Sequence, residues 1–196
     1  MNFLLKNQKT ISKISLNKLK KKGTKKMKLF EVAIKGVSPL IQNRFNDVSE
    51  DKTKKKEYND EDEAKQRLYI NQNIIYQPAE HIERAMQKAG VNFKYSGKKS
   101  FLDFIKSGIF INPDFIPHKI QGYEIDKRPV NIMKMKIMRC RPIFKEWELD
   151  FNIECINDDI SEKTLNEILV YAGKFIGIGD YRPRYGRFII TKFNLR

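Results

Sequence analysis

Strict alternation of apolar and polar side chains marks the clearest predicted strand, over residues 146–155. Every odd position from Trp147 to Cys155 is apolar, and every even position is acidic or an amide. This is the period of two expected of a strand with one buried face. We therefore expect one face to join the core and the other to display Glu148, Asp150 and Glu154.

The same pattern, less complete, predicts further strands over residues 29–35, 69–76, 109–111, 123–125 and 188–193. In residues 29–35 the apolar side chains fall on one side, as in a half-buried strand. Residues 188–193 are apolar on both faces. Strands of that kind are covered on both faces, so this strand is expected to lie in the centre of its sheet.

Two segments carry apolar residues at helical spacing. The first starts at Pro78 and ends at Gly90, and its apolar stripe predicts a core-facing helix. The second starts after Ser161, a typical N-cap residue, and its stripe continues to Ile176. A shorter helix is expected over residues 99–106. The main elements then run strand, helix, strand, strand, helix, strand, which predicts an α+β fold with a ferredoxin-like, or RNA-recognition-motif-like, antiparallel sheet and two main helices.

Charge divides the chain into a tail and one domain. Residues 1–28 contain ten lysines and no acidic residue, so residues 1–27 are expected to be a flexible basic tail. The alternative is a cloning or start-site artefact in which Met27 is the natural first residue. Residues 28–196 are expected to form a single domain, with residues 46–67 as a charged loop insertion.

Composition narrows the class of protein. The 196 residues are 40% hydrophobic and 11% aromatic, enough for one packed core. The net charge of +15 indicates an anionic partner. No apolar run approaches the roughly 18–20 residues of a membrane-spanning helix, so we expect a cytoplasmic protein without membrane contact. Cys140 and Cys155 fit neither a disulfide framework nor zinc spacing, so no metal or cofactor is expected.

A basic strip over residues 127–145 contains seven Lys or Arg residues and no acidic one. Such a strip attracts a phosphate chain through summed Coulomb energy and counterion release. Lys134 and Lys136 differ in parity from Arg139 and Arg141, so a bulge near Met138 is expected to bring the two pairs to one face. The alternative is an edge strand that charge keeps soluble.

A glycine-rich segment over residues 172–188 interleaves glycine, arginine and tyrosine. Glycine allows close backbone approach to a ligand, arginine forks onto phosphate oxygens, and tyrosine stacks on bases. The segment is neither a P-loop nor a dinucleotide fingerprint. A structural turn whose arginines pair with the acidic strand face is the alternative. The candidate nucleic-acid-binding residues are Lys134, Lys136, Arg139, Arg141, Lys174, Gly177, Gly179, Tyr181, Arg182, Arg184, Tyr185, Gly186 and Arg187.

The run IGIGDYRPRYGRF between a predicted helix and a predicted strand resembles the glycine-rich loop of the repeat-associated mysterious protein (RAMP) superfamily. The similarity is strongest to the backbone subunits of CRISPR effector complexes, which coat guide RNA, and small phage or prophage proteins end in a similar way. Gly179, Gly186 and Arg187 match the loop, whereas Arg184 replaces a middle glycine and Pro183 is unusual. The resemblance implies an RNA-recognition-motif-like fold, a single-stranded ligand and head-to-tail assembly.

The two histidines, His81 and His118, are candidates for an acid and a base in RNA cleavage, as in the processing endonucleases of that superfamily. No partner residue is identifiable for either one, so we do not expect an enzyme. A metal site that combines them with the two cysteines is disfavoured, because structural zinc ligands come in closely spaced pairs.

The sequence therefore predicts a sequence-tolerant binder of single-stranded nucleic acid, RNA ahead of DNA, that assembles along the strand as a homo-oligomer or as a subunit of a larger nucleoprotein complex. The ligand is expected to avoid the acidic strand face and to follow the basic strip, the glycine-rich segment and the tail. The alternatives are a metal-independent endoribonuclease and a basic structural component of a phage or ribonucleoprotein assembly.

Overall fold

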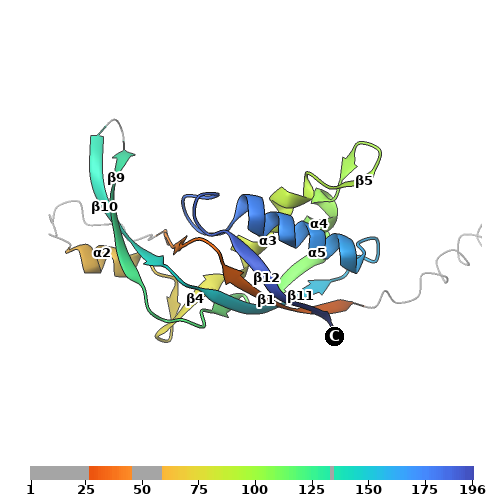
Figure 1. Ribbon diagram of the computed structural model, residues 1–196, viewed down its shortest axis with the longest axis horizontal. Helices are drawn as coiled ribbons and strands as arrows, with labels where there is room; N and C mark the ends of the chain where they lie inside the picture. The colour runs from red at the N-terminus through yellow and green to blue at the C-terminus, as the bar shows by residue number, and fades with distance from the viewer. Residues whose placement is uncertain (1–26, 46–58, 133–134) are drawn as a thin grey trace, which may run out of the picture.

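The computed structural model describes residues 27–45, 59–132 and 135–196 (Figure 1). The predicted tail, up to residue 26, and most of the predicted insertion, residues 46–58, lie outside these ranges, and so does Lys134. The fold is mixed α+β, with antiparallel strand pairs and four α-helices within the described ranges. None of these helices has the length and hydrophobicity needed to cross a membrane.

A four-stranded sheet organises the molecule. Its strand order is β12 (Phe188–Leu195), β1 (Lys28–Gly36), β11 (Glu148–Cys155) and β7 (Ile109–Asn112), with each neighbouring pair antiparallel. Helices α3 (Ala79–Gly90), α4 (Leu102–Gly108) and α5 (Glu162–Tyr171) lie on one side of the sheet (Figure 1). The chain connects β1 to β7 through α3 and α4, and connects β11 to β12 through α5.

The predicted alternation is confirmed in the core. On β11 the odd-numbered side chains are buried, and Glu148, Asp150 and Glu154 project from the other face. On β1 the even-numbered apolar side chains are buried in the same way. Trp147 is fully buried, and its indole N–H donates to the Ser38 carbonyl at 2.9 Å. This bond satisfies the polar end of the largest side chain in the core.

The two main helices form where the periodicity predicts them. Ser161 caps α5, because its hydroxyl accepts from the Thr164 N–H at 3.1 Å. The stripe continues past α5 into a π-helical turn, η1 (Ala172–Ile176). Pro78 is the N-cap of α3 rather than its first residue, and the short helix predicted over residues 99–106 starts later, at Leu102.

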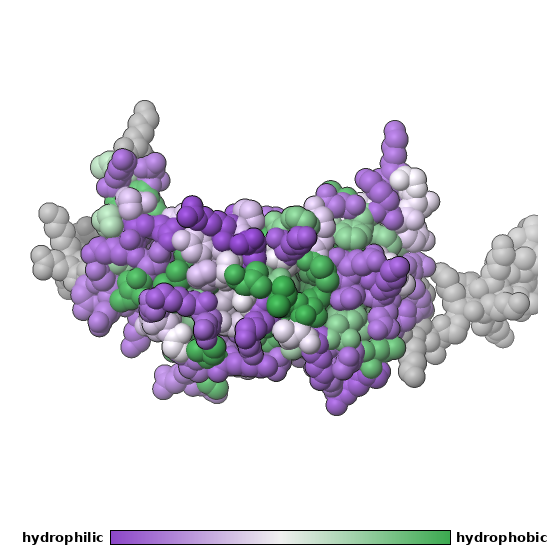
Figure 2. Space-filling model, in the orientation of Figure 1, coloured by the Kyte–Doolittle hydropathy of each residue, from purple (hydrophilic) through white to green (hydrophobic). Residues whose placement is uncertain are grey.

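The position predicted for the last strand is wrong. β12 is an edge strand that pairs with β1 alone among the described strands. Its inner apolar side chains contact the core, and Phe193 stacks on Phe30 at 5.1 Å between ring centroids. Ile189 on the other face is 52% exposed, and so is Leu195, which lies on the inner side opposite Phe30 at the end of the strand. Hydrophobic side chains gather over β12 in Figure 2. Apolar residues on both faces therefore reflect an exposed apolar edge here, not a central strand.

A long hairpin of β9 (Glu124–Ile132) and β10 (Met135–Phe144) projects at one end of the molecule (Figure 1). It contains Glu124 and Ile125 of the short strand predicted over residues 123–125 and most of the described residues of the basic strip. The predicted bulge near Met138 is wrong, because the pairing runs unbroken from Met135 opposite Ile132 to Ile143 opposite Glu124. Lys136 consequently projects from the opposite face of β10 to Arg139 and Arg141.

Short elements complete the described chain. They are β2 (Leu40–Ile41), α2 (Asp60–Gln66), β3 (Ile70–Asn71), β4 (Ile74–Pro78), β5 (Lys94–Ser96), β6 (Lys99–Ser100) and β8 (Phe115–Pro117). Helix α2 lies within the predicted charged loop, and Asn59 caps it by accepting from the Asp62 N–H at 2.7 Å. Its first turn is acidic, which suits the positive end of the helix dipole. β2 pairs with β10, so the hairpin is attached to the segment that follows β1.

Candidate nucleic-acid interface

The glycine-rich loop, residues 177–187, is attached by backbone hydrogen bonds to β2 and to the residue before it, Pro39. The Asp180 N–H donates to the Ile41 carbonyl and the Gly186 N–H to the Pro39 carbonyl, each at 2.8 Å. Ile178 is fully buried and anchors the loop in the core. The loop is therefore a fixed part of the fold, and its position determines which side chains can reach a ligand.

The three loop glycines adopt positive φ, at 71° for Gly177, 78° for Gly179 and 72° for Gly186. A Cβ on Gly179 would lie 2.6 Å from the Ile41 carbonyl oxygen, and a Cβ on Gly186 would lie 1.7 Å from the Ile178 carbonyl oxygen. The space that these glycines leave open is thus filled by the protein's own backbone. Their first role is to let the loop close on itself and on β2, which differs from the predicted approach of a ligand to Gly177 and Gly179.

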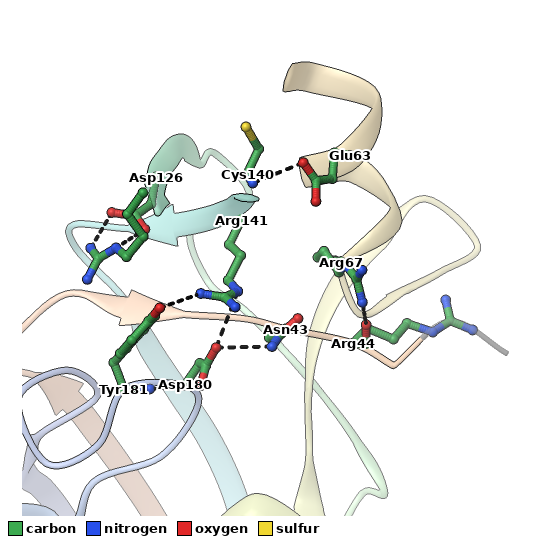
Figure 3. Close-up of polar contacts among 10 residues, drawn as sticks. Asn43, Arg44, Glu63, Arg67, Asp126, Cys140, Arg141, Asp180 and Tyr181 are labelled. Carbon is green, nitrogen blue, oxygen red and sulfur yellow. Dashed lines mark hydrogen bonds and ion pairs between the residues drawn. The ribbon is translucent and has the colours of Figure 1, made fainter. Parts of the chain in front are cut away.

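The basic strip and the glycine-rich loop meet at an arginine–tyrosine cluster of Arg128, Arg141, Tyr181 and Tyr185. Figure 3 labels two of its members, Arg141 and Tyr181. The Arg128 guanidinium carbon lies 4.7 Å from the centroid of the Tyr181 ring and 5.1 Å from that of Tyr185. Arg141 lies 5.1 Å from the Tyr181 ring and donates to its hydroxyl at 2.9 Å. An aromatic face attracts a cation placed over it. Contacts between residues 40 to 57 positions apart in the sequence therefore join the hairpin and the loop into one surface.

Tyr181 is held in an unusual backbone conformation. Its φ of 54° lies in the left-handed region, which costs a non-glycine residue roughly 1–2 kcal/mol. Its N–H donates to Asp180 Oδ1 at 2.9 Å, and its hydroxyl accepts from Arg141. These contacts fix the direction of the ring, and backbone strain of this kind is typical of ligand-binding positions.

Carboxylates outside the strip neutralise two of its arginines. Asp180 Oδ2 lies 3.4 Å from Arg141 Nε and also accepts from Asn43 Nδ2 at 3.1 Å (Figure 3). Hydrogen bonding to Asp126 raises the pKa of Arg128. Neither carboxylate belongs to the strip, so the sequence count of cations alone overstates its local charge.

The hairpin register sets Arg128 directly opposite Arg139, an arrangement in which like charges repel. Each arginine has its own carboxylate, because Arg139 Nη1 donates to Glu63 Oε1 on α2 at 3.1 Å and Arg128 pairs with Asp126. The other oxygen of Glu63 accepts from the Cys140 N–H at 3.1 Å (Figure 3). Helix α2 therefore orders the base of the hairpin.

A hollow of about 310 Å³ opens beside the cluster, between α2 and the hairpin. Its lining is mostly polar and consists of Asn43, Glu63, Arg67, Val130, Asn131, Arg139, Cys140 and Arg141. Arg67 also donates to the Arg44 carbonyl at 3.3 Å (Figure 3). Guanidinium and amide groups of this kind supply donors for phosphate oxygens and for the acceptor atoms of bases.

The remaining predicted cations are exposed. Arg182, Arg184 and Arg187 have no ion pair with any residue in the described ranges, so they do not pair with the acidic strand face. That face is matched by lysines instead, with Lys119 Nζ 2.9 Å from Asp150. Lys174 lies on η1, where its ammonium is 5.2 Å from the ring of Phe175 rather than against the arginine–tyrosine cluster.

The two histidines belong to one polar network with Gln42 and Gln77. Gln42 Nε2 lies 3.3 Å from His118 Nε2 and donates to Gln77 Oε1 at 3.2 Å, and Gln77 in turn contacts His81 Nδ1. Burial lowers the pKa of His118 to about 4. Burial, and then the charges of Arg182 and Arg84, lower the pKa of His81 to about 4. Both side chains are thus neutral at pH 7, and His81 lies near a loop arginine.

The described residues contain no group of three His, Cys, Asp or Glu side chains placed to hold a metal ion. Burial raises the pKa of the Cys140 thiol to about 11, so this cysteine is not a reactive thiolate at neutral pH.

Sequence reasoning missed Arg128, Asn43 and Asp180 as members of the site. The hairpin register is the signal that would place Arg128 beside Arg139 and Arg141. Asp180 sits between two candidate residues and stands out as the one acidic residue of the glycine-rich segment. Nothing local in the sequence points to Asn43.

No protein-family model matches this chain, and no curated protein matches it.

Proposed function

We propose that this protein binds single-stranded nucleic acid, RNA ahead of DNA, at the surface where the β9–β10 hairpin meets the glycine-rich loop. The observation that carries this proposal is the arginine–tyrosine cluster, in which Arg128 and Arg141 order the rings of Tyr181 and Tyr185. Stacking on aromatic rings contributes roughly 1–3 kcal/mol per base and tolerates any base. Guanidinium groups beside the rings supply phosphate contacts.

The exposed arginines of the loop extend this surface. Arg182, Arg184 and Arg187 lie within a few residues of the two tyrosines and have no ion pair among the described residues. Their charges are available to phosphates. The outward face of β11 is less suitable, because its carboxylates already pair with lysines and would repel a backbone.

We also propose a ferredoxin-like, RAMP-like arrangement for the core. The order β12, β1, β11, β7 corresponds to 4-1-3-2 when the four strands are numbered along the chain, and helices α3 and α5 form the two crossovers. The glycines that shape the loop, Gly179 and Gly186, support the resemblance to RAMP loops. Assembly along a strand belongs to the same proposal, and the exposed apolar edge of β12 is a surface on which copies can pack.

The test replaces Arg182, Arg184 and Arg187 together by glutamine. Each charge-assisted bond contributes about 1.5–3 kcal/mol, so the loss of two such bonds lowers affinity roughly 10²- to 10⁴-fold. Fluorescence anisotropy with labelled oligouridine and oligodeoxythymidine measures the effect and compares RNA with DNA. A log–log salt slope of about −0.7 per phosphate contacted is expected for the wild type.

The matched control replaces Lys94, Lys98 and Lys99 by glutamine. These exposed lysines lie on and around the β5–β6 turn, and their substitution removes three positive charges, as in the arginine variant. Equal losses in the two variants would mean that binding responds to net charge and that the proposed surface is wrong. A wild-type protein that binds neither oligonucleotide at low salt would also contradict the proposal.

A metal-independent endoribonuclease is the second candidate, because Arg182 lies close enough to His81 to lower its pKa. A neutral histidine beside a phosphate-binding arginine can act as a general base. Cleavage of labelled RNA without metal, lost in His81→Ala, is the result that would support this candidate.

A further inference from the structure

A second concentration of positive charge lies on the helical side of the molecule. A hollow of about 390 Å³ opens between α3, α4 and the glycine-rich loop. Four of its lining side chains are cationic: Arg84 and Lys88 from α3, Lys106 from α4 and Arg182 from the loop. We call it the basic pocket. None of these residues except Arg182 was a candidate from the sequence.

No carboxylate lines the basic pocket. Among the described residues Arg84 has an ion-pair partner, Glu80 one turn earlier at 2.9 Å, whereas Lys88, Lys106 and Arg182 have none. Four cations that converge on one hollow repel each other. A ligand with several negative charges removes that repulsion and gains contacts with three separate segments of the chain.

The apolar part of the lining adds a second requirement. Val91, at the end of α3, and Leu102, at the start of α4, lie among the cations. A purely inorganic anion would leave these side chains in water, whereas the sugar or base of a nucleotide can cover them. The volume is also within the range of pockets that hold small ligands.

We propose that the basic pocket binds the adjacent phosphate groups of a nucleotide, either free or at the end of a nucleic-acid strand. The site is distinct from the arginine–tyrosine cluster, and it does not depend on the proposed function because a free phosphate compound can occupy it. Arg182 lines the pocket from the loop, next to Tyr181 of the arginine–tyrosine cluster, so the two surfaces share this segment.

His81 provides a reporter for the pocket. Burial is the largest cause of the lowered pKa of its ring, and the charges of Arg182 and Arg84 are the next largest. Bound phosphate offsets these charges, so it should raise the pKa of His81 and move its ring resonances. The chain has one other histidine, His118, which is 3% exposed. Burial alone lowers the pKa of His118. His118 shares the Gln42–Gln77 network with His81, but no arginine acts on its pKa, so its resonances should move less than those of His81 and provide the internal reference.

The experiment titrates the full chain with inorganic triphosphate and then with ATP, without metal, and follows the histidine resonances by NMR. Saturable shifts of His81, larger than those of His118, are expected. ATP should bind more tightly than triphosphate because its base covers Val91 and Leu102. The variant with Arg84, Lys88 and Lys106 changed to glutamine should bind both compounds at least tenfold more weakly. The variant with Lys94, Lys98 and Lys99 changed to glutamine should bind them like the wild type.

Equal affinities in the pocket variant and the control variant would overturn the proposal, and so would the absence of saturable binding to the wild type. The single variant Lys88→Gln changes one exposed side chain and should also bind triphosphate more weakly than the wild type. It keeps the test valid if the triple variant fails to fold. Oligouridine with and without a 5′-triphosphate separates the two sources of the phosphates. Tighter binding of the triphosphorylated oligonucleotide indicates that the pocket holds the end of a strand. Equal affinities for the two oligonucleotides indicate that it holds a free nucleotide. Because the pocket variant retains Arg182, Arg184 and Arg187, oligonucleotide binding at the other surface is tested separately.

Discussion

Replacing Asp180 by asparagine should strengthen nucleic-acid binding. Asp180 occupies the centre of the proposed interface, where Oδ2 lies 3.4 Å from Arg141 Nε and accepts from Asn43 at 3.1 Å. The side chain of Arg141 is 12% exposed and that of Asp180 is 31% exposed. A phosphate that reaches Arg141 must therefore share the guanidinium with this carboxylate and is repelled by it.

The size of the effect follows from Coulomb's law. An arginine that bridges two anions holds them about 7 Å apart, and the repulsion between two unit charges at that distance is about 0.6 kcal/mol in water and about 2.4 kcal/mol at an effective dielectric constant of 20. Removal of the charge should tighten binding roughly 3- to 60-fold. Asparagine keeps an amide oxygen for the Tyr181 N–H, so the cost in stability should stay near 1 kcal/mol.

Anisotropy with labelled oligouridine, together with urea unfolding, measures both quantities. The matched control is Asp150→Asn, which changes net charge equally but removes a carboxylate from the outward face of β11, where Lys119 is its partner at 2.9 Å. Weaker binding by Asp180→Asn would refute the idea that phosphate competes with Asp180 for Arg141. An equal gain in both variants would show that net charge alone controls the affinity.

Two further predictions concern stability. Gly186→Ala should destabilise the fold by roughly 2–4 kcal/mol in urea unfolding, because φ is 72° and the new Cβ would lie 1.7 Å from a backbone oxygen; Gly122→Ala, where nothing lies within 4 Å, should change stability little. Burial lowers the pKa of His118 from 6.5 to about 4, so unfolding takes up a proton between these values and stability should fall as pH drops through them, by on the order of 3 kcal/mol. His118→Gln should flatten that part of the pH profile, and an unchanged profile would contradict the buried neutral histidine.

The sequence predicts best those elements whose own residue pattern shows which side chains are buried. The alternation in β11 and the stripe of α5 each state which side chains face the core, so the element and its inner face follow from the residue pattern. The capping role of Ser161 is equally local. Such features need no knowledge of what packs against them.

The sequence does not determine which strands and side chains lie beside one another in the fold. An apolar strand such as β12 reads alike at the centre and at an exposed edge, because the pattern does not say whether a neighbour covers it. The regular register of the hairpin, nine residues of β10 paired with β9, makes Lys136 face away from Arg139. No local feature of the sequence indicates whether a bulge interrupts this pairing. Asp180 and Glu63 reach the strip from distant positions.

The ion pairs divide the arginines of the proposed interface into two groups with different roles. Arg128 and Arg141 are partly buried and already paired, so they add little net charge but hold the two tyrosine rings in place before any ligand arrives. The exposed loop arginines have no such partners in the described chain, so their field extends into solvent, where salt screens it. The paired arginines therefore determine where bases stack, and the unpaired ones determine how strongly the strand is attracted. Binding that persists in high salt should consequently depend on Tyr181 and Tyr185 more than on the charge of the loop.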